Sequence, residues 1–349
     1  IKLHRLCDEL DARGVALTNM GDIDQQSISG ATQTSTHGTG LAFGNLATQI
    51  AALRLVTADG SVLDLSPDQD PDLFDAARVG LGALGLVSTV TLRCPPAFRL
   101  HAVEAPLPVD EVLAHLDELV AEHDHYEFYW VPHTRWALTK ANRRTSEPPR
   151  PRSAVREWVD DIALQNAAFG ALCRVGRRWP SSIPRRAKII PSTGTIDYID
   201  RSDRVFTSPR KVRFWEMEYA IPREALPEAL NRVRHLVDHI GVPISFPVEV
   251  RVSAPDDIWL STAHGRETGY IAVHVYKGTP YDAYFSGVEA IMSTYGGRPH
   301  WGKLHFQRAA SLATHYPKWN EFQSVRRRLD PEGRFTNPYL DRVLGSEND

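Results

Sequence analysis

The stretch GATQTSTHGTG, residues 30–40, contains three glycines, four threonines and one histidine, His37, but no large apolar side chain. Because glycine has no Cβ, a backbone with such small side chains can come very close to a partner. Backbone N–H groups that are left open in this way bind anions such as phosphate. The stretch therefore predicts that this part of the chain lies directly against a ligand.

A second glycine-rich segment lies further along the chain, where Gly80, Gly82 and Gly85 precede the β-prone run 86–94. Asp70 is a suitable N-cap for a helix that ends near residue 78. A helix, a glycine turn and a strand can together present N–H groups to a phosphate. Glycines between two elements also occur simply to make a turn, so this segment alone does not decide between the two interpretations.

The composition is that of an ordinary globular protein. With 349 residues, of which 42% are apolar and 24% charged, the chain is long enough for two domains or one large domain with an insertion. A net charge of -3 gives no reason to expect a nucleic acid as partner. The three cysteines lie far apart and lack the spacing of zinc ligands, so we expect neither a disulfide framework nor a metal. Since no apolar run reaches about 18 residues, we expect a cytoplasmic protein.

Hydrophobic periodicity predicts an α+β unit in the second half of the chain. Helices are predicted over 109–124, 155–175, 224–241 and 319–333, and strands over 125–134, 211–222, 246–255 and 270–277. This order is typical of a sheet that is covered on one face by helices. In the first half we expect a helix over 1–14, short extended pieces through 30–40, and a hairpin over 51–65.

Residues 140–188 are basic and rich in proline, as in NRRTSEPPRPRS (142–153) and GRRWPSSIPRRAK (176–188). One interpretation is a solvated loop that flanks the predicted helix 155–175. The other is peripheral contact with an anionic membrane surface or with a protein partner.

The alternating stretch FPVEVRV, residues 246–252, places Glu249 and Arg251 side by side on one face of a strand. Such a pair is commonly a solvent-facing ion pair that adds little stability. Alternatively, both side chains point into a substrate cavity, where the carboxylate accepts hydrogen bonds from hydroxyls and the guanidinium stabilises negative charge. The pattern alone leaves both interpretations open.

The segment HWGKLH, residues 300–305, brings His300, Lys303 and His305 together. A surface lysine and ordinary buried histidines would account for it. A lysine buried beside an aromatic or cofactor ring would instead have a perturbed pKa and could donate hydrogen bonds to a substrate. No third ligand is evident near the two histidines, so a metal site is not expected here.

Taken in order, these segments resemble the sugar-lactone oxidoreductases of the vanillyl-alcohol-oxidase type, which include L-gulono-1,4-lactone and D-arabinono-1,4-lactone oxidases, related dehydrogenases and alditol oxidases. The motifs that carry the resemblance span nearly the whole chain: GDIDQQSISGATQTSTHGTG (21–40), GLGALGLVSTVTLRC (80–94), VFTSPRKVRFWEMEYAIPRE (205–224), VEVRV (248–252), RPHWGKLH (298–305) and DPEGRFTNPYL (330–340). The resemblance implies a two-domain α+β flavoprotein. It would have the remainder of an FAD-binding domain (1–96), a substrate or cap domain with an antiparallel sheet covered by helices (97–290), and a C-terminal segment that returns to the flavin site (291–349).

The resemblance also assigns a cofactor, FAD, and the residues around it. Glu249, Arg251 and Lys303 would face the substrate over the flavin ring. The residues that would line the FAD are Gly30, Ala31, Thr34, Ser35, Thr36, His37, Gly38, Thr39, Gly40, Gly85, Leu86, Val87, Ser88 and His300.

The implied reaction is oxidation of an aldono-1,4-lactone by hydride transfer from a CH–OH carbon to flavin N5, with oxygen or another compound as the final electron acceptor. An alditol oxidase that acts on open-chain polyols is the alternative within this family. A non-catalytic remnant that acts as a binding protein is the alternative outside it, because residues 1–29 do not match the additional FAD-binding segment with which family members begin. We expect that this segment is missing from the sequence rather than lost from the protein.

Overall fold

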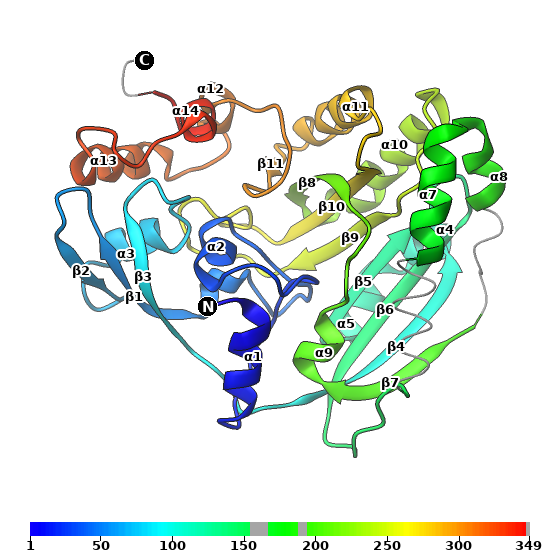
Figure 1. The fold of residues 1–349 in the computed structure, drawn as a ribbon, viewed down its shortest axis with the longest axis horizontal. Helices are drawn as coiled ribbons and strands as arrows, with labels where there is room; N and C mark the ends of the chain where they lie inside the picture. The colour runs from blue at the N-terminus through cyan, green and yellow to red at the C-terminus, as the bar shows by residue number, and fades with distance from the viewer. Residues whose placement is uncertain (154–166, 188–193, 347–349) are drawn as a thin grey trace.

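The structure is a computed structural model that describes residues 1–153, 167–187 and 194–346, and its described part contains two sheets (Figure 1). A three-stranded sheet has the order β2-β1-β3, and an eight-stranded sheet has the order β11-β8-β10-β9-β5-β6-β4-β7. The strands are β1 (Ile50–Val56), β2 (Val62–Leu65), β3 (Leu86–Leu92), β4 (Arg99–Pro108), β5 (His125–Trp130), β6 (Trp136–Thr145), β7 (Ile196–Arg201), β8 (Phe214–Pro222), β9 (Val248–Ser253), β10 (Thr268–Tyr276) and β11 (Arg298–Pro299).

Helices accompany both sheets (Figure 1). They are α1 (Leu3–Asp11), α2 (Ile28–Gln33), α3 (Pro71–Arg78), α4 (Val109–Ala114), α5 (Leu116–Glu122), α7 (Phe169–Arg178), α8 (Ile183–Ala187), α9 (Ser202–Phe206), α10 (Leu226–His239), α11 (Asp282–Ser293), α12 (Ala309–Leu312), α13 (Trp319–Leu329) and α14 (Pro338–Leu344). Among the described residues, none of the helices combines the length and the apolar character that a membrane-spanning segment needs.

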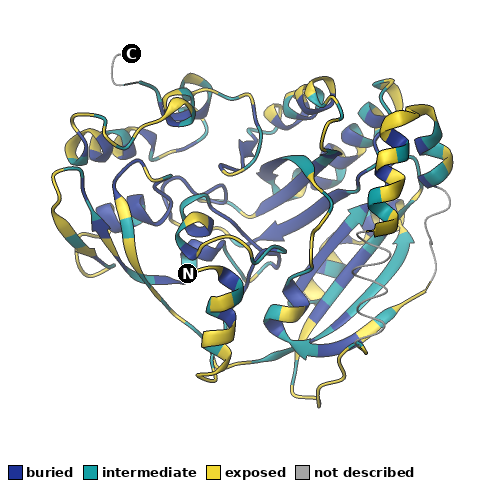
Figure 2. Ribbon diagram, in the orientation of Figure 1, coloured by how far each residue is buried: buried dark blue, intermediate teal, exposed yellow. Residues whose placement is uncertain are grey.

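One face of the eight-stranded sheet forms an apolar core with helices. Val248, Val250 and Val252 of β9 lie in this core together with side chains from α4, α5, α10 and α11. Figure 2 shows the central strands of the sheet as buried. Because side chains alternate along a strand, the residues between these valines point to the opposite face. The predicted α+β architecture, an antiparallel sheet covered by helices, is confirmed.

The smaller unit contains the predicted hairpin, in which β1 and β2 pair antiparallel. Asp59 closes the turn by accepting hydrogen bonds from the Thr57 hydroxyl at 2.6 Å and from the Ser61 backbone N–H at 3.0 Å. A second apolar core joins this hairpin to α3, α13 and α14.

The proposed domain bounds of 1–96, 97–290 and 291–349 remain a prediction. Two segments link the units across these bounds. Residues 258–260, between β9 and β10, lie in the core of the smaller unit, and β11 of the C-terminal segment pairs with β8 of the large sheet.

The first part of the stretch 30–40 is helical, so the expectation of extended pieces throughout is wrong. Residues 28–33 form α2, whose N-cap Ser27 accepts a hydrogen bond from the backbone N–H of Gly30 at 3.1 Å. The cap satisfies an N–H group that would otherwise lack a partner at the start of the helix. Burial of Ile28 and Ala31 against the neighbouring core then stabilises a turn of helix that the sequence alone does not favour.

After a turn at Thr34 and Ser35, the second part of this stretch has no regular secondary structure and contacts the large sheet. Thr39 donates its hydroxyl to the carbonyl of Tyr126 at 2.6 Å and accepts the backbone N–H of Val252 at 3.2 Å. The N–H of Gly40 donates to the carbonyl of Val252 at 2.9 Å. In Figure 1, α2 lies between the three-stranded and eight-stranded sheets. The stretch therefore lies against the large sheet at β5 and β9.

Several predicted elements differ in their bounds. The helix predicted over 1–14 ends at Asp11, before Gly14 with its φ of 71°, and the helix over 109–124 is divided at His115 into α4 and α5. The basic region does not begin as a solvated loop, because residues 140–145 belong to β6 and Lys140 is buried. The helix predicted over 155–175 is observed from Phe169 in α7, whereas its residues 155–166 lie outside the described residues.

Gly38 leaves no room for a side chain, because a Cβ there would overlap the carbonyl oxygen of Met20 and the side chain of Asn19. We expect Gly38→Ala to lower the free energy of unfolding by about 1–3 kcal/mol, since the Met20 backbone cannot simply move aside. Urea denaturation measures this change. The control is Gly170→Ala in α7, where the nearest atom would lie 3.4 Å away and a change below about 1 kcal/mol is expected. Equal losses in both variants would contradict the tight contact at Gly38.

Candidate active site

The face of the eight-stranded sheet opposite the helices carries a cluster of ionisable side chains. The strand register explains why they meet: Tyr129 lies opposite Glu249, and Glu216 lies opposite His274. We call this cluster the polar face, which comprises Glu127 and Tyr129 of β5, Glu216 and Glu218 of β8, Glu249 and Arg251 of β9, His274 of β10, and Lys303 from the loop after β11.

Arg251 is the centre of one half of the polar face. Its Nε donates to Glu127 Oε2 at 2.7 Å, and its terminal nitrogen pairs with the carboxylate of Glu249. The Tyr129 hydroxyl donates to Glu249 Oε1 at 3.1 Å. Both predicted residues, Glu249 and Arg251, are only 7% exposed. The interpretation of a solvent-facing ion pair is therefore wrong.

Lys303 is the centre of the other half. Its Nζ lies 2.5 Å from Glu216 Oε1 and 2.6 Å from Glu218 Oε2. The His274 Nε2 lies 3.2 Å from the same oxygen of Glu216. Lys303 is half-buried, and the interpretation of an ordinary surface lysine is wrong. The three predicted substrate-facing residues thus lie on one polar face.

His37 connects the stretch 30–40 to this face. Its Nε2 lies 3.2 Å from Glu218 Oε1, its Nδ1 lies 2.8 Å from the carbonyl oxygen of Gly38, and its ring stacks on Tyr270 with centroids 3.5 Å apart. The ring of His300 is 6.1 Å away, and its Nδ1 accepts the backbone N–H of Gly302 at 3.0 Å. The two histidines predicted to line the cofactor are therefore both buried beside the polar face.

Burial and neighbouring charges shift the pKa values of the glutamates on the polar face in opposite directions. Burial alone would raise the pKa of Glu216 and of Glu218, but the Lys303 ammonium lowers both below their usual range. Burial raises the pKa of Glu249 in spite of its pairing with Arg251. Burial and the nearby Lys303 lower the pKa of His300 to about 3, so its ring is neutral and can accept the Gly302 N–H. Glu249 is thus better suited than Glu216 or Glu218 to take up a proton.

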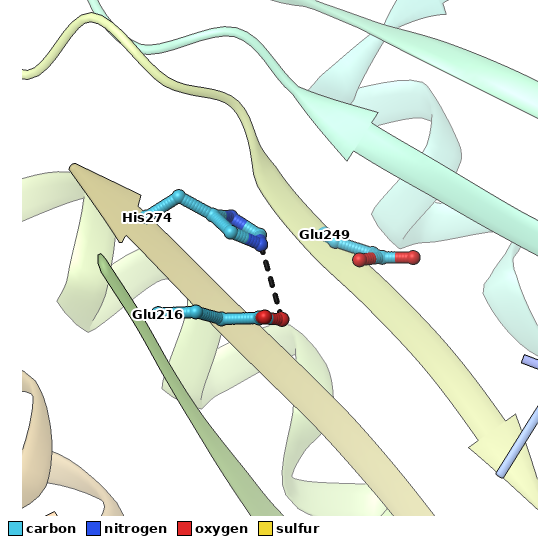
Figure 3. Close-up of side chains that lie close together, drawn as sticks. All are labelled: Glu216, Glu249 and His274. Atoms are coloured by element: carbon cyan, nitrogen blue, oxygen red, sulfur yellow. Dashed lines mark ion pairs between the residues drawn. The ribbon is translucent and has the colours of Figure 1, made fainter. Parts of the chain in front are cut away.

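Glu216, Glu249 and His274 place their ligand atoms within 4.8 Å of one another, which is close enough for a shared cation. Figure 3 shows His274 joined to Glu216 by an ion pair, with Glu249 beside them on the neighbouring strand. Lys303 already contacts Glu216, and Arg251 already contacts Glu249. We therefore assign these carboxylates to the ion-pair network of the polar face.

The two glycine-rich segments lie together, as a long cofactor would require. The side-chain oxygen of Gln33 accepts the N–H of Gly80 at 3.1 Å and of Gly82 at 3.4 Å. Gly85 has a φ of 146°, and a Cβ there would lie 2.5 Å from the carbonyl oxygen of Val56. Leu86 is 62% exposed although it is large and apolar, so a ligand along this turn would cover it.

The predicted FAD-lining residues fall into two groups. Gly30, Leu86 and Ser88 are exposed along the outer part of the two segments, and Thr34 and Val87 are partly exposed. The buried members lie close to the polar face or beneath the turn: Ala31, Ser35, Thr36, His37, Gly38, Thr39, Gly40, Gly85 and His300. This arrangement fits an extended cofactor that runs along the surface turn and ends at the polar face. The roles of the individual residues remain predictions.

Five members of the polar face are not predicted from the sequence: Glu127, Tyr129, Glu216, Glu218 and His274. A signal was present, because YEFYW and WEMEY alternate charged or polar residues with apolar ones in the same way as VEVRV. The local pattern predicts only that each of these side chains lies on a strand, and it does not identify which face of the sheet is buried.

The fold and the polar face define an FAD-dependent oxidoreductase with the vanillyl-alcohol-oxidase type of fold. Two solved structures support the fold: cholesterol oxidase from B. sterolicum, at a TM-score of 0.74 and 18% identity, and a solvent-stable cholesterol oxidase, at a TM-score of 0.76 and 18% identity. The alignments cover 98% and 99% of this chain, and 80% of each structure. A family described as FAD binding domain matches residues 1–66, which identifies the cofactor.

The chain belongs to the D-arabinono-1,4-lactone oxidase family, which matches residues 90–343. It is 49% identical over 347 residues to the L-gulono-1,4-lactone dehydrogenase of Mycobacterium tuberculosis, an alignment that covers 99% of this chain and 80% of the relative. It is 34% identical to the L-gulonolactone oxidase of Bos taurus and 31% identical to the alditol oxidase of a Streptomyces species, with 99% of this chain and 79% of each relative covered.

Removal of the Arg251 charge should strongly destabilise the protein. We expect Arg251→Met to lower the free energy of unfolding by about 3–5 kcal/mol, because Glu127 and Glu249 would stay buried without their shared cation. Urea denaturation near neutral pH measures the loss. The control is Arg54→Met, which removes an exposed pair with Asp64 and should cost no more than about 1 kcal/mol. A loss as small as that of the control would contradict the buried network.

Proposed function

We propose that this oxidoreductase acts on an aldono-1,4-lactone of the L-gulono or D-arabinono type. The observation that carries the proposal is the buried polar face beside the FAD-binding stretch, where Glu249 and Arg251 lie in contact and Lys303 lies on the same face. The names of the relatives support this substrate class. A sugar lactone carries several hydroxyls, which such a set of donors and acceptors would bind.

The residues of this chain would have separate roles. Glu249 accepts a hydrogen bond from the reacting hydroxyl and, with its raised pKa, takes up the hydroxyl proton. Arg251 and Lys303 stabilise the negative charge that develops on the substrate oxygen. FAD, when bound, would supply the acceptor for the hydride that leaves the CH–OH carbon. The main contribution of the protein is to hold that carbon in the correct position.

An open-chain alditol is the second candidate substrate, because the alditol oxidase of Streptomyces aligns over 99% of this chain. The higher identity to the lactone dehydrogenase, 49% against 31%, favours the lactone. The reduced flavin also needs an electron acceptor. Relatives named oxidase and dehydrogenase both align with this chain, so oxygen and another acceptor compound are both candidates.

An anaerobic visible spectrum of the FAD-loaded protein tests the substrate. We expect L-gulono-1,4-lactone to bleach the flavin band, and Glu249→Gln to slow the bleaching by about 10²-fold or more, since the variant retains the shape but not the base. The control is Glu289→Gln, which changes a half-buried carboxylate on α11 that contacts Tyr219 and Phe306 and should leave the rate unchanged.

Each result of this experiment has a distinct meaning. Bleaching by xylitol or sorbitol but not by lactones would replace the lactone with an alditol. Flavin that is bound but not reduced by either class would favour a non-catalytic binding protein. Equal rates in Glu249→Gln and in the unchanged protein would remove Glu249 from proton transfer.

We further propose that α7 and α8 contact an anionic lipid surface on the cytoplasmic side of a membrane. Residues 169–187 contain five arginines and no acidic residue, and Leu172 and Trp179 are 38% and 58% exposed among them. Arginines next to exposed apolar side chains suit a lipid interface better than a nucleic-acid backbone. Free Cys7, Cys94 and Cys173 support a reducing compartment.

Co-sedimentation with vesicles tests the lipid contact. We expect the protein to bind phosphatidylcholine vesicles that contain phosphatidylglycerol, and the double variant Arg174→Gln, Arg178→Gln to lose at least about 10-fold in affinity, at about 1 kcal/mol per charge. Arg54→Gln, which removes an exposed arginine from β1, is the control and should bind normally. Equal binding to vesicles without phosphatidylglycerol, or unchanged binding by the double variant, would contradict the proposal.

A further inference from the structure

We propose that Glu218 is a positioning residue that holds the Lys303 ammonium on the polar face and connects it to His37 of the FAD-binding stretch. The part of Lys303 in catalysis rests on the proposed function, whereas the connection itself rests on the geometry. Glu218 is 2% exposed and uses its two oxygens for different partners. Its Oε2 lies 2.6 Å from Lys303 Nζ, and its Oε1 lies 3.2 Å from His37 Nε2.

The backbone reinforces this connection. The N–H of His300 donates to the carbonyl of Glu218 at 2.9 Å, and the N–H of Leu304 donates to the carbonyl of Glu216 at 2.9 Å. The loop that carries Lys303 is therefore fixed at both ends to the two residues whose side chains contact its ammonium. Few conformations of the lysine remain, which is the requirement for a group that must meet a substrate oxygen at one position.

The ring of His37 lies between Glu218 and the backbone of its own stretch. An oxygen acceptor lies next to each ring nitrogen: Glu218 Oε1 next to Nε2, and the Gly38 carbonyl oxygen next to Nδ1. A ring N–H at Nε2 can donate to the Glu218 carboxylate. His37 thus links Glu218 to the stretch 30–40. Because its nitrogens are both engaged, its contribution to the cofactor site is to orient Glu218.

Glu216 does not have the same role, although it also contacts Lys303. One of its oxygens, Oε1, faces both Lys303 Nζ and His274 Nε2. These three groups all belong to the polar face, so Glu216 makes no link to the stretch 30–40. The ionisable groups that face Lys303 from its own loop and from neighbouring elements are Glu216 and Glu218 of β8, Glu249 of β9, His274 of β10, His37 and His300.

Competitive labelling of the holoenzyme with acetic anhydride measures the protonation of Lys303 directly. Acetylation requires the neutral amine, and mass spectrometry of the peptide with Lys303 gives its rate. In Glu218→Gln we expect acetylation of Lys303 to be about tenfold faster or more at pH 9 than in the unchanged protein, because the loss of one carboxylate neighbour should lower its pKa by about one unit or more. Glu218→Asp should restore part of the protection, and Glu289→Gln should not change it.

The activity of the same variants tests the consequence for catalysis. Since Lys303 must be charged, the alkaline limb of the kcat profile of Glu218→Gln should move to lower pH, by about one unit or more, while Glu289→Gln keeps the original profile. Unchanged acetylation in both Glu218→Gln and Glu218→Asp would overturn the proposal, as would an equal increase in Glu289→Gln. Faster acetylation in an enzyme that does not oxidise lactones would leave the connection in place and reject the proposed function instead.

Discussion

Charge neutralisation on the polar face is the constraint on which the rest of the structure depends. Glu127, Glu216, Glu218 and Glu249 lie in a place where an unpaired carboxylate would cost several kcal/mol. Arg251 pairs with two of them and Lys303 with the other two, so each cation stabilises a pair. Arg251 comes from the sheet itself, but Lys303 comes from the C-terminal part of the chain. The need for its charge therefore helps the backbone hydrogen bonds of His300 and Leu304 to hold the loop 300–305 against β8.

The sequence predicts those parts of this arrangement that are local. Alternation in VEVRV places Glu249 and Arg251 on one face because side chains alternate in any strand, and the Asp59-Gly60 turn closes its hairpin through contacts within five residues. The same alternation in WEMEY could not identify Glu218 as part of the site. Its partner Lys303 lies 85 residues further along the chain, and the two meet only because the sheet has the order β11-β8-β10-β9.

Local composition is misleading where tertiary contacts decide the structure. Lys140 lies in a segment whose arginines and prolines indicate a solvated loop, yet its side chain is buried because it lies opposite Glu127 and donates to the Val205 carbonyl. The helix α2 forms from residues with a low intrinsic preference for helix, and the contacts of its buried face outweigh that preference. In both cases the deciding partner belongs to a distant part of the chain, which no short window of sequence contains.

The stretch 30–40 satisfies two requirements at once, and this explains its small side chains. On the solvent side, the small residues Gly30 and Thr34 leave the backbone accessible beside the exposed Leu86. Toward the inside, Gly38 fits against the backbone of Met20 while His37 and Thr39, on either side of it, reach Glu218 and Val252. A side chain at Gly38 would overlap Asn19 and the Met20 carbonyl and so disturb the positions of the two flanking residues. Hydride transfer needs the donor carbon and the acceptor atom at a fixed short distance. The cofactor-binding stretch and the strands of the polar face are joined by hydrogen bonds of Thr39 and an ion-pair contact of His37 on either side of Gly38, and these contacts fix the stretch against the sheet.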